Sequence, residues 1–272
     1  MQHAMIRPLS IAVLVALLLA SAPVASAQPV TPRPIDRPSV IGGDSSRLGT
    51  FTVNLAHPSD FVAQTSFVRC VGASVQMMLN IDRPGADRSA RTQRRLQKLA
   101  RSLSGPAPRG FVRHGASIRG WTAALGLESG GAWQMVGADS LNEAMRIAAK
   151  AIRRWNQPVG LLVWRGRHAW VMSGFVATSD PALTDSFRVT RAYILDPLYP
   201  HGSTIWGPSP KPGTAIPVSQ VGEQFVRRRT SSIWNALPMM GQLAGRYALV
   251  VPVAIQPPGS WRQHMALATL AL

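Results

Sequence analysis

The sequence predicts an α+β fold in which helices come first and antiparallel strands follow. Three observations support this. Helical periodicity dominates up to Trp155, two apolar runs joined by a turn come next, and a last apolar run lies near the end of the chain. Because helices precede strands instead of alternating with them, the pattern favours segregated packing over a parallel sheet. We expect one domain over 51–255, with a helical part over about 51–156 and a sheet part over about 157–255.

Residues 1–27 have the features of a secretory signal peptide. A start with Arg7 precedes an apolar stretch from Leu9 to Ala20, and a small-residue triplet closes the segment at 25–27. The stretch is short for a membrane span, and no later segment offers the roughly 18 uncharged apolar residues that a span needs. We therefore expect a mature chain that begins at Gln28 without a transmembrane segment. This predicts a secreted protein, extracellular or in the cell envelope; an uncleaved membrane anchor is the alternative.

Two further segments lack the pattern of a packed element. Residues 28–50 are rich in Pro, Gly and Ser and have no apolar period, which indicates an extended linker. Residues 256–272 contain the turn sequence QPPG and a weakly apolar end, which indicates a C-terminal tail. The predicted domain thus lies between a linker and a tail.

The first predicted helices include the only cysteine. Apolar residues at helical spacing predict a helix over 70–80, with Cys70 in its first turn and Pro84 just beyond its end. A stripe of Leu and Ala predicts a second helix within 88–105, whose remaining faces are basic. A third helix is expected over 117–125.

A strand and a longer helix follow. Residues 131–138, GAWQMVGA, read as a short strand. In the next helical pattern, 139–155, Ser140 and Glu143 have the spacing of a capping box, which predicts the start of the helix.

The sheet is expected in the later part of the chain. Residues 159–164 and 167–175 are apolar runs on either side of Arg-Gly, which predicts a hairpin with a two-residue turn. A third strand is expected over 187–196, ending at an aspartate. A short helix is expected at 218–229 and a last strand at 246–255.

The chain has a formal charge of +17, and 46% of its residues are hydrophobic. The hydrophobic content excludes a disordered protein, and the charge favours contact with anionic surfaces. Cations gather on the second helix at Arg91, Arg94, Arg95, Lys98 and Arg101. This set predicts either a contact with an anionic surface or the solvated face of a core-packed helix. No zinc-finger or RNP-type motif accompanies the charge, so specific nucleic-acid binding is not expected.

Cys70 cannot form a disulfide within its own chain, although an exported protein could use one. One interpretation is a buried small hydrophobe, since free cysteines are among the most buried residues. The other is a nucleophile. A thiol attacks a carbonyl carbon as the thiolate, which the partial positive charge of a helix N-terminus favours. An imidazole beside it would complete the activation.

His168 is the candidate for that imidazole. It opens an apolar strand directly after a turn, whereas the other histidines of the predicted domain lie in loops. Asp196 ends the next predicted strand, where its carboxylate could accept a hydrogen bond from the imidazole and fix its tautomer. His168 could also be a structural residue, and Asp196 with the proline after it could be a plain turn.

Gln64, six positions before Cys70 at a helix start, followed by RHAWVMSGF and YILDP, resembles the papain-like cysteine peptidase fold, most closely the bacterial peptidase C39-like group. The resemblance implies a helix bearing the nucleophile against an antiparallel sheet bearing the other two residues. It implies Cys70 as nucleophile, His168 as base and then acid, and Asp196 as the orienting group. It also implies Gln64 as an oxyanion-hole donor.

We expect a secreted thiol hydrolase that cleaves a peptide or amide bond of a peptide or protein substrate through an acyl-enzyme. Two alternatives remain open: transglutaminase-like acyl transfer, and an inactive papain-like module that binds an anionic partner. No H-E-x-x-H motif, cysteine pair or P-loop is present, so neither a metal nor a nucleotide cofactor is expected. The eight tryptophans, Trp164 among them, are expected mainly in the core or in a groove.

Overall fold

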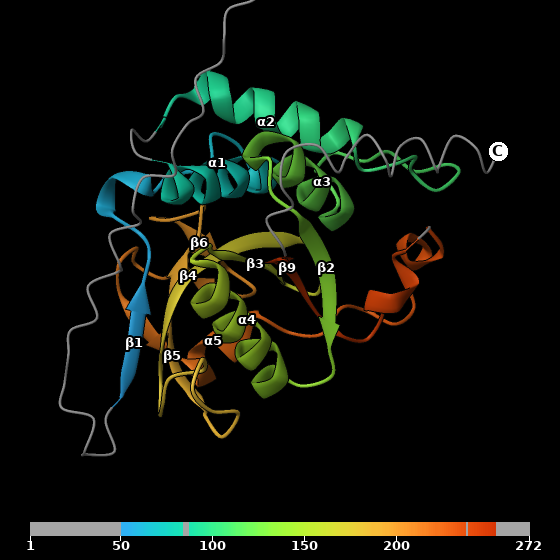
Figure 1. The fold of residues 1–272 in the computed structure, drawn as a ribbon. Helices are drawn as coiled ribbons and strands as arrows, with labels where there is room; N and C mark the ends of the chain where they lie inside the picture. Colours follow the sequence, from blue (N-terminus) through green and yellow to red (C-terminus); the bar gives the residue numbers. More distant parts are fainter. Residues whose placement is uncertain (1–49, 84–86, 238, 254–272) are drawn as a thin grey trace, which may run out of the picture. The chain divides into compact units, whose positions relative to one another are not determined.

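The computed structural model describes residues 50–83, 87–237 and 239–253. The predicted signal peptide, the linker except its last residue, and the predicted tail lie outside these residues. The described part contains five α-helices and an antiparallel sheet, which confirms the predicted α+β class (Figure 1).

Seven strands of the described chain form one antiparallel sheet. Along its main path lie β2 (Trp133–Ala138), β9 (Tyr247–Pro252), β3 (Val159–Val163), β4 (His168–Ala177), β5 (Val189–Leu195) and β8 (Ala215–Pro217), while β1 (Phe51–Asn54) pairs with β4. A separate short ribbon consists of β6 (Gly202–Ser203) and β7 (Gly207–Pro208). Every residue of β3 is buried, because helices cover both faces of the sheet there. This explains why β3 reads as a continuous apolar run and not as an alternating one.

The helices are α1 (Cys70–Asp82), α2 (Ala90–Ser102), α3 (Ile118–Ser129), α4 (Leu141–Trp155) and α5 (Val218–Gln224). Short 3₁₀ turns occur at η1 (Pro58–Asp60), η2 (Ile233–Ala236) and η3 (Gly241–Leu243). Three helices begin after a serine whose side chain accepts a backbone hydrogen bond: Ser89 for α2, Ser117 for α3 and Ser140 for α4. In α4 the carboxylate of Glu143 reaches back to the N–H of Asp139, one residue before the cap.

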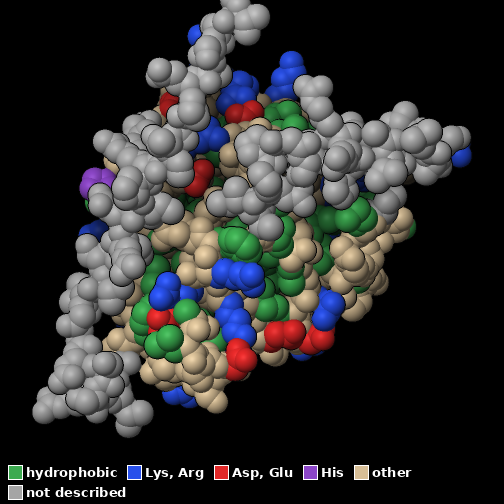
Figure 2. Space-filling view, viewed as in Figure 1, with side chains coloured by type: hydrophobic (Ala, Val, Ile, Leu, Met, Phe, Trp, Pro, Cys, Tyr) green, Lys and Arg blue, Asp and Glu red, His purple; other side chains and the backbone are tan. Residues whose placement is uncertain are grey.

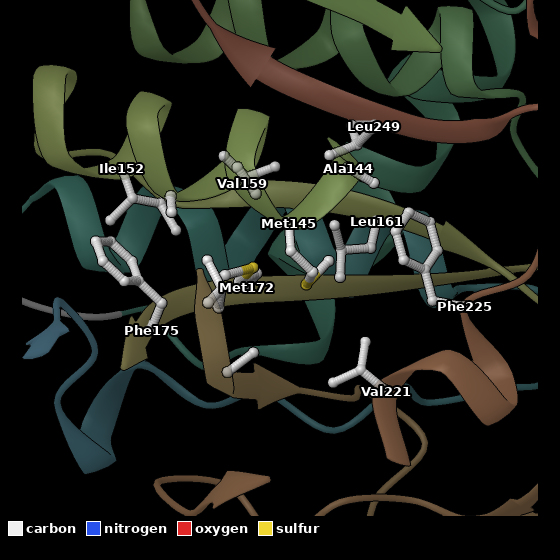
Figure 3. Packing of buried hydrophobic residues seen from close by; sticks show 14 of the residues in the cluster. Ala144, Met145, Ile152, Val159, Leu161, Met172, Phe175, Val221, Phe225 and Leu249 are labelled. Atoms are coloured by element: carbon white, nitrogen blue, oxygen red, sulfur yellow. The ribbon is translucent and has the colours of Figure 1, made fainter. Parts of the chain in front are cut away.

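Two apolar clusters lie on opposite faces of the sheet. On one face α1 and α3 pack against the sheet and α2 packs on these two helices, and on the other face α4 and α5 pack against the sheet. Figure 3 shows the second cluster, where Met145 and Ile152 of α4 meet Met172 and Phe175 of β4. Residues 169–172 of β4 alternate between the clusters, as the period of a strand requires. A register shift between Met172 and Gly174 then brings Phe175 into the same cluster as Met172.

The structure differs from the expected division into a helical part and a sheet part. β1 and β2 precede residue 157 and still belong to the sheet, and α4 lies on the face opposite α1. The hairpin turn is also longer than the two residues expected. Val163 pairs directly with His168, so residues 164–167 form the loop, and Trp164 and Arg165 both have positive φ.

Candidate active site

Cys70 is the first residue of α1. Its side chain is almost covered, with 9% of the residue exposed. The N-cap residue, Arg69, makes no side-chain capping hydrogen bond, and the N–H of Gly72 instead donates to Oε1 of Gln97 at 2.8 Å. The start of α1 is therefore tied to α2, with its positive end at the sulfur.

His168 and Asp196 meet because β4 and β5 are antiparallel neighbours. His168 opens β4 and Asp196 directly follows β5, so the two residues lie at the same edge of the sheet. The distance from Nε2 of His168 to Oδ1 of Asp196 is 2.7 Å, and the two side chains are 3% and 0% exposed. Oδ1 of Asp196 also accepts the N–H of Leu198 at 2.8 Å, which fixes the orientation of the carboxylate.

The thiol of Cys70 completes this group of side chains. Burial alone would lower the pKa of His168, but hydrogen bonds to Asp196 and Cys70 and the negative charges of both raise the pKa to about 9. Since Nε2 faces Asp196, Nδ1 is the ring nitrogen left for the sulfur. His168 and Asp196 are thus joined by a hydrogen bond, and Cys70 acts on the same ring through its effect on the pKa of His168.

Gln64 lies beside this group through its backbone. Its N–H donates to the carbonyl of Pro197, next to Asp196, at 2.6 Å. Its side-chain Nε2 donates to the carbonyl of Ser66 at 3.0 Å, and among the described residues its Oε1 has no hydrogen-bond partner. One N–H of the amide remains for a further acceptor. Among the described residues, Gln64 forms its hydrogen bonds with Pro197 and Ser66 and not with Cys70.

A buried glutamine of α2 holds the loop that carries Gln64. Oε1 of Gln93 accepts from the N–H of Thr65 at 2.8 Å and from its hydroxyl at 2.7 Å. Nε2 of Gln93 donates to the carbonyl of Ala63 at 2.9 Å. Sequence reasoning missed this residue, because a glutamine within a basic helix gives no sign that its amide is buried.

Trp164 covers the imidazole. Its ring stacks on that of His168, with 4.1 Å between centroids and 20° between planes. Gln224 of α5 holds Trp164 from two sides, by a bond from Nε1 to Oε1 and a bond between the backbones, each 2.9 Å long. The sequence predicted a groove or core position for this tryptophan but no partner. The position of Trp164 directly before the predicted Arg-Gly turn is the only sequence signal that could have suggested His168 as its partner.

This arrangement can support nucleophilic chemistry at sulfur, with a buried, oriented imidazole as proton carrier. Within residues 50–83, 87–237 and 239–253, no group of three or more His, Cys, Asp or Glu side chains could hold a metal ion. No described helix is long and apolar enough to cross a membrane. Comparisons of the chain with protein-family models, with curated proteins and with solved structures gave no match.

Proposed function

We propose that this chain is a secreted, papain-like thiol hydrolase, similar to the bacterial peptidase C39-like group, that cleaves a peptide or amide bond. The hydrogen bond between His168 and Asp196, together with the effect of Cys70 on the pKa of His168, is the observation that carries the proposal. A helix that begins at the thiol, packed on an antiparallel sheet that bears the other two residues, supports the same assignment.

The proposed reaction has two halves. The Cys70 thiolate attacks the carbonyl carbon, a C–S bond forms, and the carbonyl π electrons move to oxygen. The amide of Gln64 and the backbone N–H of Cys70 would bind that oxyanion. Imidazolium then gives its proton to the nitrogen, the C–N bond breaks, and an amine leaves. Water next attacks the thioester carbon while His168 takes its proton, and a C–O bond forms. The C–S bond then breaks, which releases the carboxylic acid and restores the Cys70 thiolate beside the His168 imidazolium.

Burial explains why the carboxylate matters. His168 is nearly inaccessible, so water cannot solvate an imidazolium there, and a fixed negative partner must do so instead. Asp196 supplies that charge at hydrogen-bond distance. Trp164 excludes water from one face of the ring, which strengthens the pair by lowering the local dielectric.

Alkylation of the native chain tests the proposal. Iodoacetamide should modify Cys70 in the folded protein at neutral pH, and His168→Ala should slow the reaction because the proton acceptor is lost. The matched control is Gln157→Ala, which removes a buried polar side chain that donates to Asp82, at the opposite end of α1 from Cys70. A thiol that reacts only in denaturant, at the same rate in both variants, would contradict the assignment and favour an inert core cysteine.

The same acyl-enzyme could pass its acyl group to an amine instead of water. Peptide substrates offered with and without an added primary amine separate the two outcomes. Release of the free acid in both conditions supports hydrolysis. An amide product that replaces the acid supports acyl transfer. Cys70→Ala should abolish either reaction, and turnover by this variant would exclude Cys70 as nucleophile.

A further inference from the structure

We propose that a basic pocket between the start of α1 and α2 binds a ligand with neighbouring phosphate groups, a property beyond the hydrolase activity. The cavity measures about 500 Å³. Five cationic side chains line it, and we call them the pocket cations: Arg69, Arg94, Lys98, Arg101 and Arg113.

No carboxylate lines the pocket, and none of the pocket cations forms an ion pair with the described residues. Other cations of the chain differ. Arg95, on a neighbouring face of α2, pairs with Glu128 at 2.5 Å, and Arg153 pairs with Asp180 at 2.9 Å. Like charges around one cavity repel unless an anion joins them, so the pocket has the electrostatics of an anion site.

Three of the pocket cations come from one face of α2. Arg94, Lys98 and Arg101 follow each other at helical spacing, four and then three residues apart. Figure 2 shows Lys and Arg side chains where α2 lies in Figure 1. The helix therefore presents a row of cations, which suits a ligand with several negative groups in a line.

The other two pocket cations are held in place by neutral groups. Arg113 donates to the carbonyl of Ser104 at 2.6 Å and its guanidinium lies 5.0 Å from the ring centre of Trp234. Arg69 donates to the hydroxyl of Thr65 at 2.7 Å. Because these contacts orient the two side chains in advance, they lower the entropic cost of binding an anion. The contacts are neutral, so the positive charge of both side chains stays uncompensated.

Two features favour phosphate over a single small anion. Guanidinium forks match phosphate oxygens with paired hydrogen bonds, and four of the five pocket cations are arginines. The volume falls in the range of pockets that hold whole small molecules, about 300–1,000 Å³, so it exceeds the need of one ion. Gln97, 5% exposed, adds an amide Nε2 that has no hydrogen-bond partner among the described residues.

The pocket adjoins the candidate active site, yet its binding can be tested separately. Arg69 precedes Cys70, and Gln97 binds the N–H of Gly72. Cys70→Ala should abolish catalysis and leave phosphate binding intact. A wild-type protein that binds phosphate but has no hydrolase activity would therefore count against the hydrolase alone.

Calorimetric titration with tripolyphosphate tests the inference. The variant Arg94→Gln/Lys98→Gln/Arg101→Gln should bind at least about tenfold more weakly than the wild type, since each lost charged hydrogen bond weakens binding. The control Arg88→Gln/Arg91→Gln/Lys211→Gln removes the same charge from exposed positions outside the pocket lining and should bind nearly as the wild type does. Lys98→Gln alone provides a milder second variant.

The source of the phosphate is a separate arm of the experiment. Neutral phosphatidylcholine vesicles with and without cardiolipin, whose head group has two phosphates, are sedimented with each variant. Pocket-dependent binding of tripolyphosphate alone indicates a soluble ligand, and pocket-dependent binding of cardiolipin vesicles indicates a lipid head group. Failure of the wild type to bind either probe, or equal loss of binding in the two triple variants, would overturn the inference.

Discussion

At the scale of single residues, His168 and Asp196 have separable roles in the proposed site. His168 transfers protons, whereas Asp196 orients the ring and stabilises its charged form through the 2.7 Å hydrogen bond. His168→Ala should lower kcat by at least about a hundredfold, and Asp196→Ala should lower it less. Steady-state kinetics checks this order, with circular dichroism to confirm folding. A larger loss in the Asp196 variant would contradict this division of roles.

In the proposed hydrolase, the pKa of His168 should set a limit on the alkaline side of activity. With a pKa raised to about 9, the imidazolium persists at neutral pH and is lost as the pH rises through that value. Because the leaving amine takes its proton from imidazolium, kcat/KM should fall above about pH 9. In Asp196→Ala the fall should begin at lower pH, because one of the groups that raise the pKa is gone. An unchanged alkaline limb would mean that another group controls it.

At the scale of elements, the site depends on the close approach of α1 and α2 at Gly72. A Cβ on Gly72 would lie 2.7 Å from the carbonyl oxygen of Gln93 and 2.8 Å from Cβ of Gln97. Gly72→Ala should therefore push the helices apart, destabilise the protein by about 1–3 kcal/mol and lower kcat, because Gln93 and Gln97 anchor the loop and helix around Cys70. Denaturant unfolding and kinetics measure both effects.

Gly126→Ala is the matched control for the α1 and α2 contact. Gly126 lies within α3, and the nearest atom to its added Cβ is 3.6 Å away. Alanine should be neutral there or stabilise the helix by up to about 1 kcal/mol, without affecting kcat. Equal destabilisation in both variants would show that the loss at Gly72 does not come from crowding between helices.

The elements also show what the sequence could and could not reveal. The start of α1 at Cys70 and of β4 at His168 followed from local apolar patterns and turns. The covering of His168 by Trp164 and the anchoring of the 63–65 loop by Gln93 involve positive φ or contacts between distant segments. Local periodicity carries no information about such contacts, because they arise only when the elements pack.

At the scale of the whole molecule, the chain has 29 Lys and Arg residues but only 12 Asp and Glu residues. Five Arg or Lys side chains of the described residues form ion pairs with carboxylates, and these carboxylates belong to Asp82, Glu128, Asp139, Asp180 and Asp185. Since acids are scarce, many cations must repel one another, and the five pocket cations surround a single cavity. We therefore expect the repulsion among the pocket cations to destabilise the folded protein when no anion is bound.

Heat unfolding at two salt concentrations tests that trade-off. At about 10 mM salt, Arg94→Gln/Lys98→Gln/Arg101→Gln should have a higher Tm than the wild type by roughly 2 °C, because removing crowded charge relieves repulsion. At about 150 mM salt the difference should shrink, since ions screen exposed charges over about 8 Å. The Arg88→Gln/Arg91→Gln/Lys211→Gln control should gain less at low salt, because its charges lie outside the pocket. A lower Tm for the pocket variant at low salt would mean that these side chains stabilise the fold through their packing, and that the protein loses no stability by keeping them.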